Sequence, residues 1–140
     1  MNNNWQFTNL ENSKRMKELG FKQESMSYWI SPVPQHGLTE WEIIDGQNTH
    51  AEYNYSAYSV AELGRMMPET VDFKDDYSPQ FLNIHQDDSR EVKGWLIRYG
   101  QGYEGEVHTE FAESEADARA FMLIWLAEQG HIDPKEANDL

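Results

Sequence analysis

Cysteine is absent from this chain of 140 residues, which excludes disulfides, thiolate metal sites and cysteine nucleophiles. Long apolar runs are absent too: the longest, Ala120–Ala127, falls far short of the roughly 20 residues that a membrane-spanning helix needs. The segment Met1–Trp5 has neither a basic start nor an apolar stretch, so we expect no signal peptide and a cytoplasmic protein. The length predicts one domain covering residues 1–140. The short apolar runs and the acidic charge predict that the protein has no membrane partner.

Basic residues are scarce relative to acidic ones. Eleven lysines and arginines stand against 25 aspartates and glutamates, for a net charge of −14. Residues 1–70 hold 9 acids and 5 bases, a net of −4, whereas residues 71–140 hold 16 acids and 6 bases, a net of −10. Such a field repels phosphate groups, so it disfavours direct nucleic-acid binding and favours a basic protein partner. The alternative interpretation is a well-solvated surface that keeps the protein in solution.

Aromatic residues make up 13% of the chain, which is enough to build a core despite the charge. The five tryptophans are many for one small core, and any that remain exposed would mark a partner site. Tyr28 and Trp29 are adjacent in a predicted strand, so their rings point to opposite faces. We therefore expect one of the two to be exposed and take both as candidates for partner binding.

A first helix is predicted by the segment Thr8-Asn9-Leu10-Glu11, which fits a capping box with Thr8 as the cap. Gly20 can adopt the left-handed conformation that ends a helix. Phe21 would then lie over Met16, as a Schellman ending requires.

Two further helices are predicted downstream. The second begins with a capping box at Ser59 and ends near Pro68, which cannot continue a helix. The third begins at Ser114 and ends at Gly130. Its last ten residues are apolar nearly all round, so every side of it must be covered. The sheet and the first helix can each cover one side, and a twofold homodimer would cover any stripe left open.

Five strands are predicted from alternating apolar residues and turn signals, at residues 25–30, 39–44, 80–85, 92–99 and 104–111. The last three form a three-stranded meander. Residues 47–58 fit either a loop or an irregular edge strand. Clustered strands with local hairpins predict an α+β fold, in which a small antiparallel sheet packs against the long C-terminal helix and the shorter helices.

No familiar catalytic motif occurs, and the strongest candidate site is a run of alternating polar residues in the last strand. Alternate residues of a strand share one face at steps of about 6.8 Å, which groups Glu104, Glu106, His108 and Glu110. Carboxylates and an imidazole can together bind a divalent metal or perform acid–base chemistry. The interpretation we favour is an ordinary solvated face, with Val107, Thr109 and Phe111 pointing inward.

Four segments resemble a family of small uncharacterised phage and prophage proteins. They are "SKRMKELGFKQESMSYWI", "AYSVAELGRMMP", "GWLIRYG" and "SEADARAFMLIWLAEQG". The shared features are a helix ending in Leu-Gly, a QxSxxYW stretch, an AELGxxxP helix and an ADAxAxMLIxL helix. This chain has Trp125 where the family often has tyrosine. The resemblance implies an accessory protein of a mobile element and carries no catalytic residue.

These observations together predict a non-enzymatic, acidic accessory or interaction protein of a phage or mobile element. We expect it to bind a basic protein partner and to need no cofactor. Two alternatives remain open. One is a metal-dependent module or hydrolase that uses the acidic and histidine strand face, and the other is a structural or oligomeric phage component.

Overall fold

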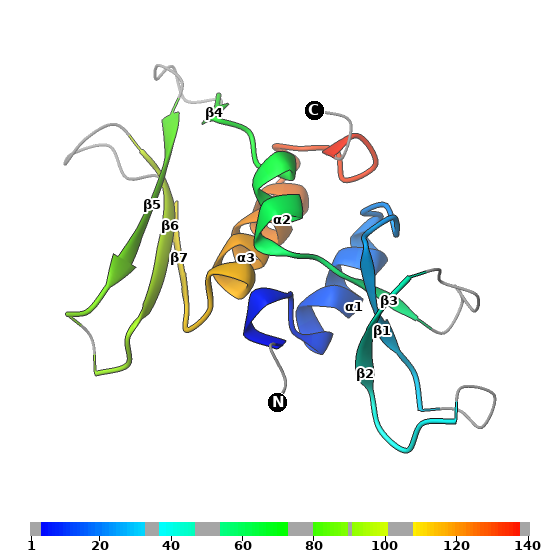
Figure 1. Cartoon of the computed structure of the whole chain (residues 1–140). Coiled ribbons are helices and arrows are strands. Elements are labelled where there is room, and N and C mark those ends of the chain that lie inside the picture. The colour runs from blue at the N-terminus through cyan, green and yellow to red at the C-terminus, as the bar shows by residue number, and fades with distance from the viewer. Residues whose placement is uncertain are drawn as a thin grey trace.

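Two antiparallel sheets lie on either side of a layer of helices in the computed structural model (Figure 1). The structure describes residues 4–32, 37–46, 54–72, 80–89, 91–100 and 108–137. The elements follow the order η1 (Asn4–Gln6), α1 (Leu10–Leu19), β1 (Ser27–Ile30), β2 (Glu42–Asp45), β3 (Tyr55–Ala57), α2 (Val60–Met66), β4 (Thr70–Val71), β5 (Gln80–Asp87), β6 (Gly94–Gly100), β7 (His108–Ala112) and α3 (Glu115–Glu128). The α+β class predicted from sequence is confirmed.

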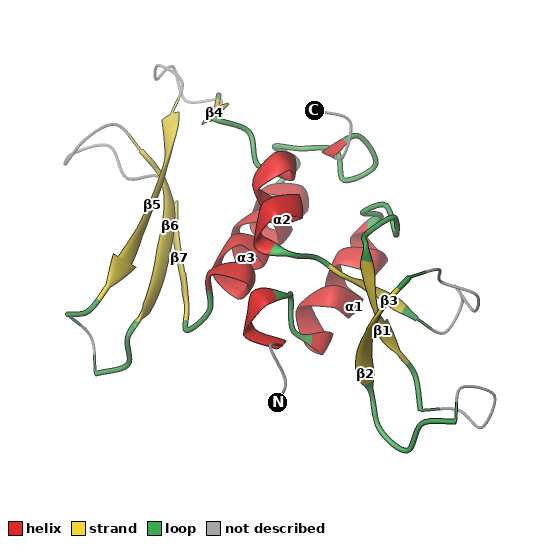
Figure 2. Ribbon diagram, viewed as in Figure 1, coloured by secondary structure: helices red, strands yellow, loops and turns green. Residues whose placement is uncertain are grey.

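The strands divide between two sheets, whereas the sequence analysis placed them in one (Figure 2). The N-terminal sheet has the order β2-β1-β3, and β1 is antiparallel to both neighbours. The third strand, β3, arises from the segment 47–58 that the sequence left open. The C-terminal sheet has the order β4-β5-β6-β7 and contains the predicted meander of β5, β6 and β7.

The first helix begins one residue later than predicted. Asn9 is the cap, and its side chain accepts a hydrogen bond from the amide of Asn12 at 2.8 Å. Thr8 is fully buried instead: its hydroxyl bonds the hydroxyl of Ser13 at 2.7 Å and accepts from the amide of Tyr58 at 3.0 Å. Its side chain was therefore unavailable as a cap because it joins α1 to the strand–helix junction after β3.

The other helix ends follow the sequence. Gly20 has a φ of 102°, and the amide of Phe21 donates to the carbonyl of Met16 at 3.0 Å, which completes the predicted Schellman ending. Ser59 forms a full capping box, and Ser114 caps α3 by accepting from the amide of Asp117 at 3.1 Å.

Helix α3 is enclosed by its own chain. It packs against β6 and β7 on one side and against α1 and α2 on the other (Figure 1). Seven of its side chains are buried, namely Ala116, Ala118, Ala120, Met122, Leu123, Ile124 and Leu126. The argument for a homodimer rested on an uncovered stripe of this helix, so that argument no longer holds. A homodimer itself stays a prediction.

Candidate functional site

His108 and Glu110, two of the four predicted site residues, lie together on β7. The His108 Nε2 and the Glu110 Oε1 are 2.8 Å apart. The imidazole also stacks on the indole of Trp125 in α3, with ring centroids 3.7 Å apart and planes 5° from parallel. The ring of His131 lies against the same indole at 5.5 Å. The pair therefore connects the edge of the C-terminal sheet to the last helix.

The face of β7 that carries this pair is the one covered by α3, not the solvated one. Glu110 is opposite Ile97 and His108 is opposite Tyr99 on β6, and directly opposed residues share a face. Ile97 and Tyr99 are fully buried. The side chains of His108 and Glu110 are only 25% and 27% exposed. The side chains of His108 and Glu110, predicted to face solvent, therefore lie on the face of the sheet that α3 covers.

Phe111, predicted to point inward, lies on the outer face of the sheet. A Cβ atom at Gly94 would come within 2.5 Å of the Phe111 ring, so the ring covers this glycine. The reversal of the two faces relative to the prediction has a physical cause. The carboxylate and the imidazole form a hydrogen bond with each other, and an indole stacks on the imidazole. Polar side chains with such partners can lie on a partly buried face, although their polarity alone would predict a solvent-exposed one.

The remaining two residues of the predicted acidic face, Glu104 and Glu106, lie outside the described residues, as does Val107. Over the ranges that the structure describes, no three histidines, aspartates or glutamates come close enough together to hold a metal ion. The part of the site that is described consists of one hydrogen-bonded pair, in which the Nε2 atom of His108 contacts Glu110.

Tyr28 and Trp29, the predicted partner-binding residues, are both buried, at 7% and 8% exposed. The expectation that one ring is exposed is therefore wrong. The Trp29 indole donates to the carbonyl of Thr8 at 2.9 Å, and the Tyr28 hydroxyl donates to the carbonyl of Gln23 at 3.1 Å. Burial raises the pKa of Tyr28, and the nearby carboxylate of Glu24 raises it further. Both rings hold the N-terminal sheet in place.

Trp5 is the tryptophan that remains exposed. All five tryptophans are described, and Trp5 is exposed over 63% of its surface, whereas the other four are buried or partly buried. It stands on η1 beside a cleft of about 600 Å³, whose apolar walls are Trp5, Ala112 and Phe121. The sequence signal for this site was the excess of tryptophans, which did not say which ring would be left outside the core.

The polar lining of the cleft is acidic. Asp117 accepts hydrogen bonds from the Asn9 amide at 2.8 Å and the Asn12 side-chain amide at 3.0 Å. Its other oxygen accepts from the Ser114 hydroxyl at 3.1 Å. Glu113 is exposed at the mouth, and within the described part of the chain it has no hydrogen-bond or ion-pair partner.

Two lysines of α1 lie over aromatic rings of the N-terminal half. The Nζ of Lys14 is 5.3 Å from the ring centre of Trp41 and 5.8 Å from that of Tyr55. The Nζ of Lys17 is 5.1 Å from the Tyr55 ring and donates to the carbonyl of Asn54 at 3.0 Å. These cations are thus engaged within the chain.

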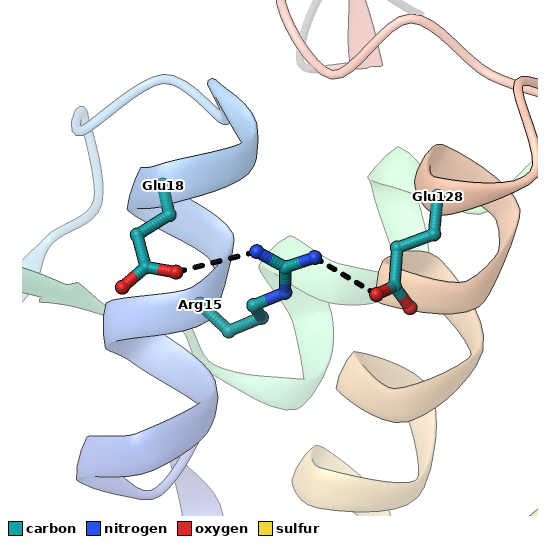
Figure 3. Close-up of polar contacts among 3 residues, drawn as sticks. All are labelled: Arg15, Glu18 and Glu128. Carbon is teal, nitrogen blue, oxygen red and sulfur yellow. Dashed lines mark hydrogen bonds and ion pairs between the residues drawn. The ribbon is translucent and has the colours of Figure 1, made fainter.

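Arg15 joins the two longest helices (Figure 3). Its guanidinium reaches Glu128 of α3 at 2.8 Å and Glu18 of α1 at 3.2 Å. These hydrogen bonds, with that to Glu128 the larger cause, raise the pKa of Arg15. After Lys14 and Lys17, Arg15 is therefore the third basic residue of α1 that makes a contact within the chain.

No family model, curated protein or solved structure matches this chain. None of the helices in the described ranges combines the length and the apolar character that crossing a bilayer requires.

Proposed function

We propose that the protein is a non-enzymatic interaction protein that binds a basic protein partner through its acidic C-terminal half. The observation that carries this proposal is the charge imbalance. If each of the 11 basic residues paired with one carboxylate, 14 of the 25 carboxylates would remain without a cation. A surface with that excess attracts basic proteins and speeds their association at low ionic strength.

Contacts of the basic residues support the same proposal. Lys14 and Lys17 lie over aromatic rings, and Arg15 binds Glu18 and Glu128. The cations of α1 are thus drawn into the N-terminal half and the helix interface. The segment 71–140, with its net charge of −10, has few cations to offset its carboxylates.

A mobile-element origin is part of the proposal. It is supported by the resemblance of four segments to small phage and prophage proteins. For such an accessory protein, a basic protein that handles nucleic acid is a suitable target, because an acidic surface can occupy the site where the phosphate backbone binds.

The test is affinity capture from a bacterial lysate at low salt with two charge variants of equal net charge. Each variant replaces three exposed glutamates by glutamine. One alters the C-terminal half at Glu91, Glu113 and Glu136, and the other alters the N-terminal half at Glu11, Glu24 and Glu42. Because the net charge of the two variants is identical, only the position of the missing charge distinguishes them.

We expect the wild-type protein to enrich basic proteins that elute as salt is raised. The C-terminal variant should lose them and the N-terminal variant should keep them. Equal loss in both variants would mean that net charge alone attracts the proteins. Capture that enriches no basic protein above background would contradict the proposed function.

A further inference from the structure

The cleft beside Trp5 has the chemistry of a binding site for a cation. We propose that it receives a cationic side chain of the basic partner, arginine in preference to lysine. This inference rests on the proposed function and adds the contact that gives it specificity. The cleft measures about 600 Å³, which is ample for one side chain, and it has an exposed indole on one wall and Phe121 on its lining.

The acids of the cleft carry uncompensated charge. All three donors to the Asp117 carboxylate are neutral: a backbone amide, the Asn12 side-chain amide and the Ser114 hydroxyl. The hydrogen bonds hold the carboxylate in place without cancelling its charge. Glu113 adds a second carboxylate at the mouth, and the described residues that line the cleft include no lysine, arginine or histidine.

The N-terminus of α3 adds a partial positive charge to the cleft. Whether the cleft favours a cation or an anion depends on how this charge compares with that of the carboxylates. A helix N-terminus carries roughly half a positive charge, which by itself attracts anions. Asp117 and Glu113 together supply two negative charges at the same place. A third acid, Glu115, forms an ion pair with Arg119 at 2.8 Å, so these two charges offset each other and are left out of the sum. The cleft is therefore negative by more than one charge and favours a cation.

The indole selects among cations. A cation over the face of a tryptophan is attracted by the ring quadrupole, and the planar guanidinium of arginine can also stack on it. Arginine has a rigid fork of donors that fits a carboxylate such as Glu113, whereas lysine offers a compact and strongly hydrated charge. Arginine is thus the side chain that can use both Trp5 and Glu113 at once.

The experiment titrates the intact protein with three short peptides, capped at both ends, in which glycine alternates with arginine, lysine or glutamine. Calorimetry gives the affinity. The indole N–H resonance of Trp5, assigned by its absence in Trp5→Phe, reports directly on the cleft. We expect the arginine peptide to bind more tightly than the lysine peptide and to shift the Trp5 resonance. The glutamine peptide should do neither.

Four variants locate the contact. Trp5→Ala should weaken arginine-peptide binding by about three- to fivefold, the size of one exposed cation–π contact. Trp5→Phe should retain much of the affinity, because phenylalanine also has a π face. Glu113→Gln should weaken binding by about two- to fivefold, as the loss of an exposed ion pair does. Glu42→Gln, on β2 in the other sheet, is the matched control and should leave the affinity near that of the wild type.

Failure of this inference can be told apart from failure of the proposed function. If the arginine peptide binds but the Trp5 resonance stays fixed, or Glu42→Gln weakens binding as much as Glu113→Gln, the acidic protein binds basic partners elsewhere and the cleft is not the site. Equal binding of the arginine and lysine peptides would overturn the preference for arginine. If no basic peptide binds at low salt, the cleft proposal fails. If the capture from lysate also enriches no basic protein, the proposed function fails as well.

Discussion

The two sheets differ in how they are enclosed. All four residues of β1, the central strand of the N-terminal sheet, are buried, because the sheet packs on α1 and the segment after α1 reaches back over it. There the side chain of Gln23 accepts from the amide of Ser56 at 2.7 Å. The C-terminal sheet is covered by α3 on one face, and its other face carries Phe81, which is 55% exposed. The central strand of the N-terminal sheet is therefore enclosed, whereas the C-terminal sheet leaves part of one face at the surface.

Charge separates the same two regions. Residues 1–70 have a net charge of −4, and residues 71–140 have a net charge of −10. In the first region lysines lie over aromatic rings, as Lys14 does over Trp41. In the second, acids such as Glu113 stand at the surface beside a cleft. The cations of α1 make contacts within the protein itself, whereas residues 71–140 carry an excess of carboxylates over cations, and the proposed binding of a basic partner depends on that excess.

The largest expected effect lies in the helix layer between the sheets. Leu123 is fully buried in α3. Leu123→Ala should lower the free energy of unfolding by about 2–5 kcal/mol, because it removes buried apolar surface and leaves a cavity. Ile44→Ala, at a position 42% exposed on β2, should cost well under half as much. Equal costs in chemical denaturation would mean that α3 is not the centre of the core.

A smaller loss is expected within the enclosed N-terminal sheet. Trp29→Phe removes the indole N–H that donates to the Thr8 carbonyl at 2.9 Å. Among the described residues, that carbonyl keeps only the longer hydrogen bond from the Ser13 hydroxyl at 3.4 Å, so we expect a cost of about 1–3 kcal/mol. Trp5→Phe, at the exposed tryptophan, should change the free energy of unfolding by less than about 0.5 kcal/mol. The same denaturant titration measures both variants. If Trp5→Phe were the more costly change, the assignment of buried and exposed tryptophans would be contradicted.

Alkaline pH should destabilise the fold chiefly through two deeply buried tyrosines, Tyr58 and Tyr99. Burial raises the pKa of Tyr58 and of Tyr99 above the ordinary value of 10.0. Above pH 10 the unfolded chain therefore loses phenolic protons that the folded chain retains, so stability falls as pH rises. Each tyrosine contributes up to about 1.4 kcal/mol per pH unit.

Thermal melts between pH 9 and pH 11 measure this slope, and Tyr58→Phe and Tyr99→Phe should each make it shallower. Tyr99→Phe also removes the hydroxyl that donates to the Pro68 carbonyl at 2.7 Å, so its melting temperature should already be lower at neutral pH. A slope that neither variant changes would show that these hydroxyls ionise freely in the folded protein.

The smallest effect is expected at the bridge between α1 and α3. Arg15 and Glu128 are 43% and 40% exposed, and exposed ion pairs contribute little to stability because water and salt screen them. A double-mutant cycle of Arg15→Ala and Glu128→Ala should give a coupling close to the limit of measurement, and it should vanish at high salt. A large coupling that survives high salt would mean that the bridge is shielded from solvent.

Much of the fold was predictable because its signals are local. Gly20, Ser59 and Ser114 end or begin helices by contacts within one turn, and the meander follows from alternation and turns. The face of β7 was not predictable in this way. It depends on the stacking of His108 on Trp125, which brings together residues far apart in the sequence.

The candidate site was harder to predict than the fold. Because adjacent strand residues point to opposite faces, the sequence predicted that either Tyr28 or Trp29 would be exposed. Both are buried, because β1 is covered on both faces. The exposed tryptophan is Trp5, which belongs to a short 3₁₀ helix without any periodic pattern. Its cleft forms only where η1 meets the start of α3, so neither segment alone carries a signal for it.

The most direct test of the difference between the two halves is a map of backbone amide shifts during titration with the arginine peptide. We predict that the shifts concentrate at Trp5, around Glu113 to Asp117, and at Phe121, and that they are absent from β1, β2 and β3. Shifts centred on the N-terminal sheet, or spread evenly over both sheets, would contradict the account.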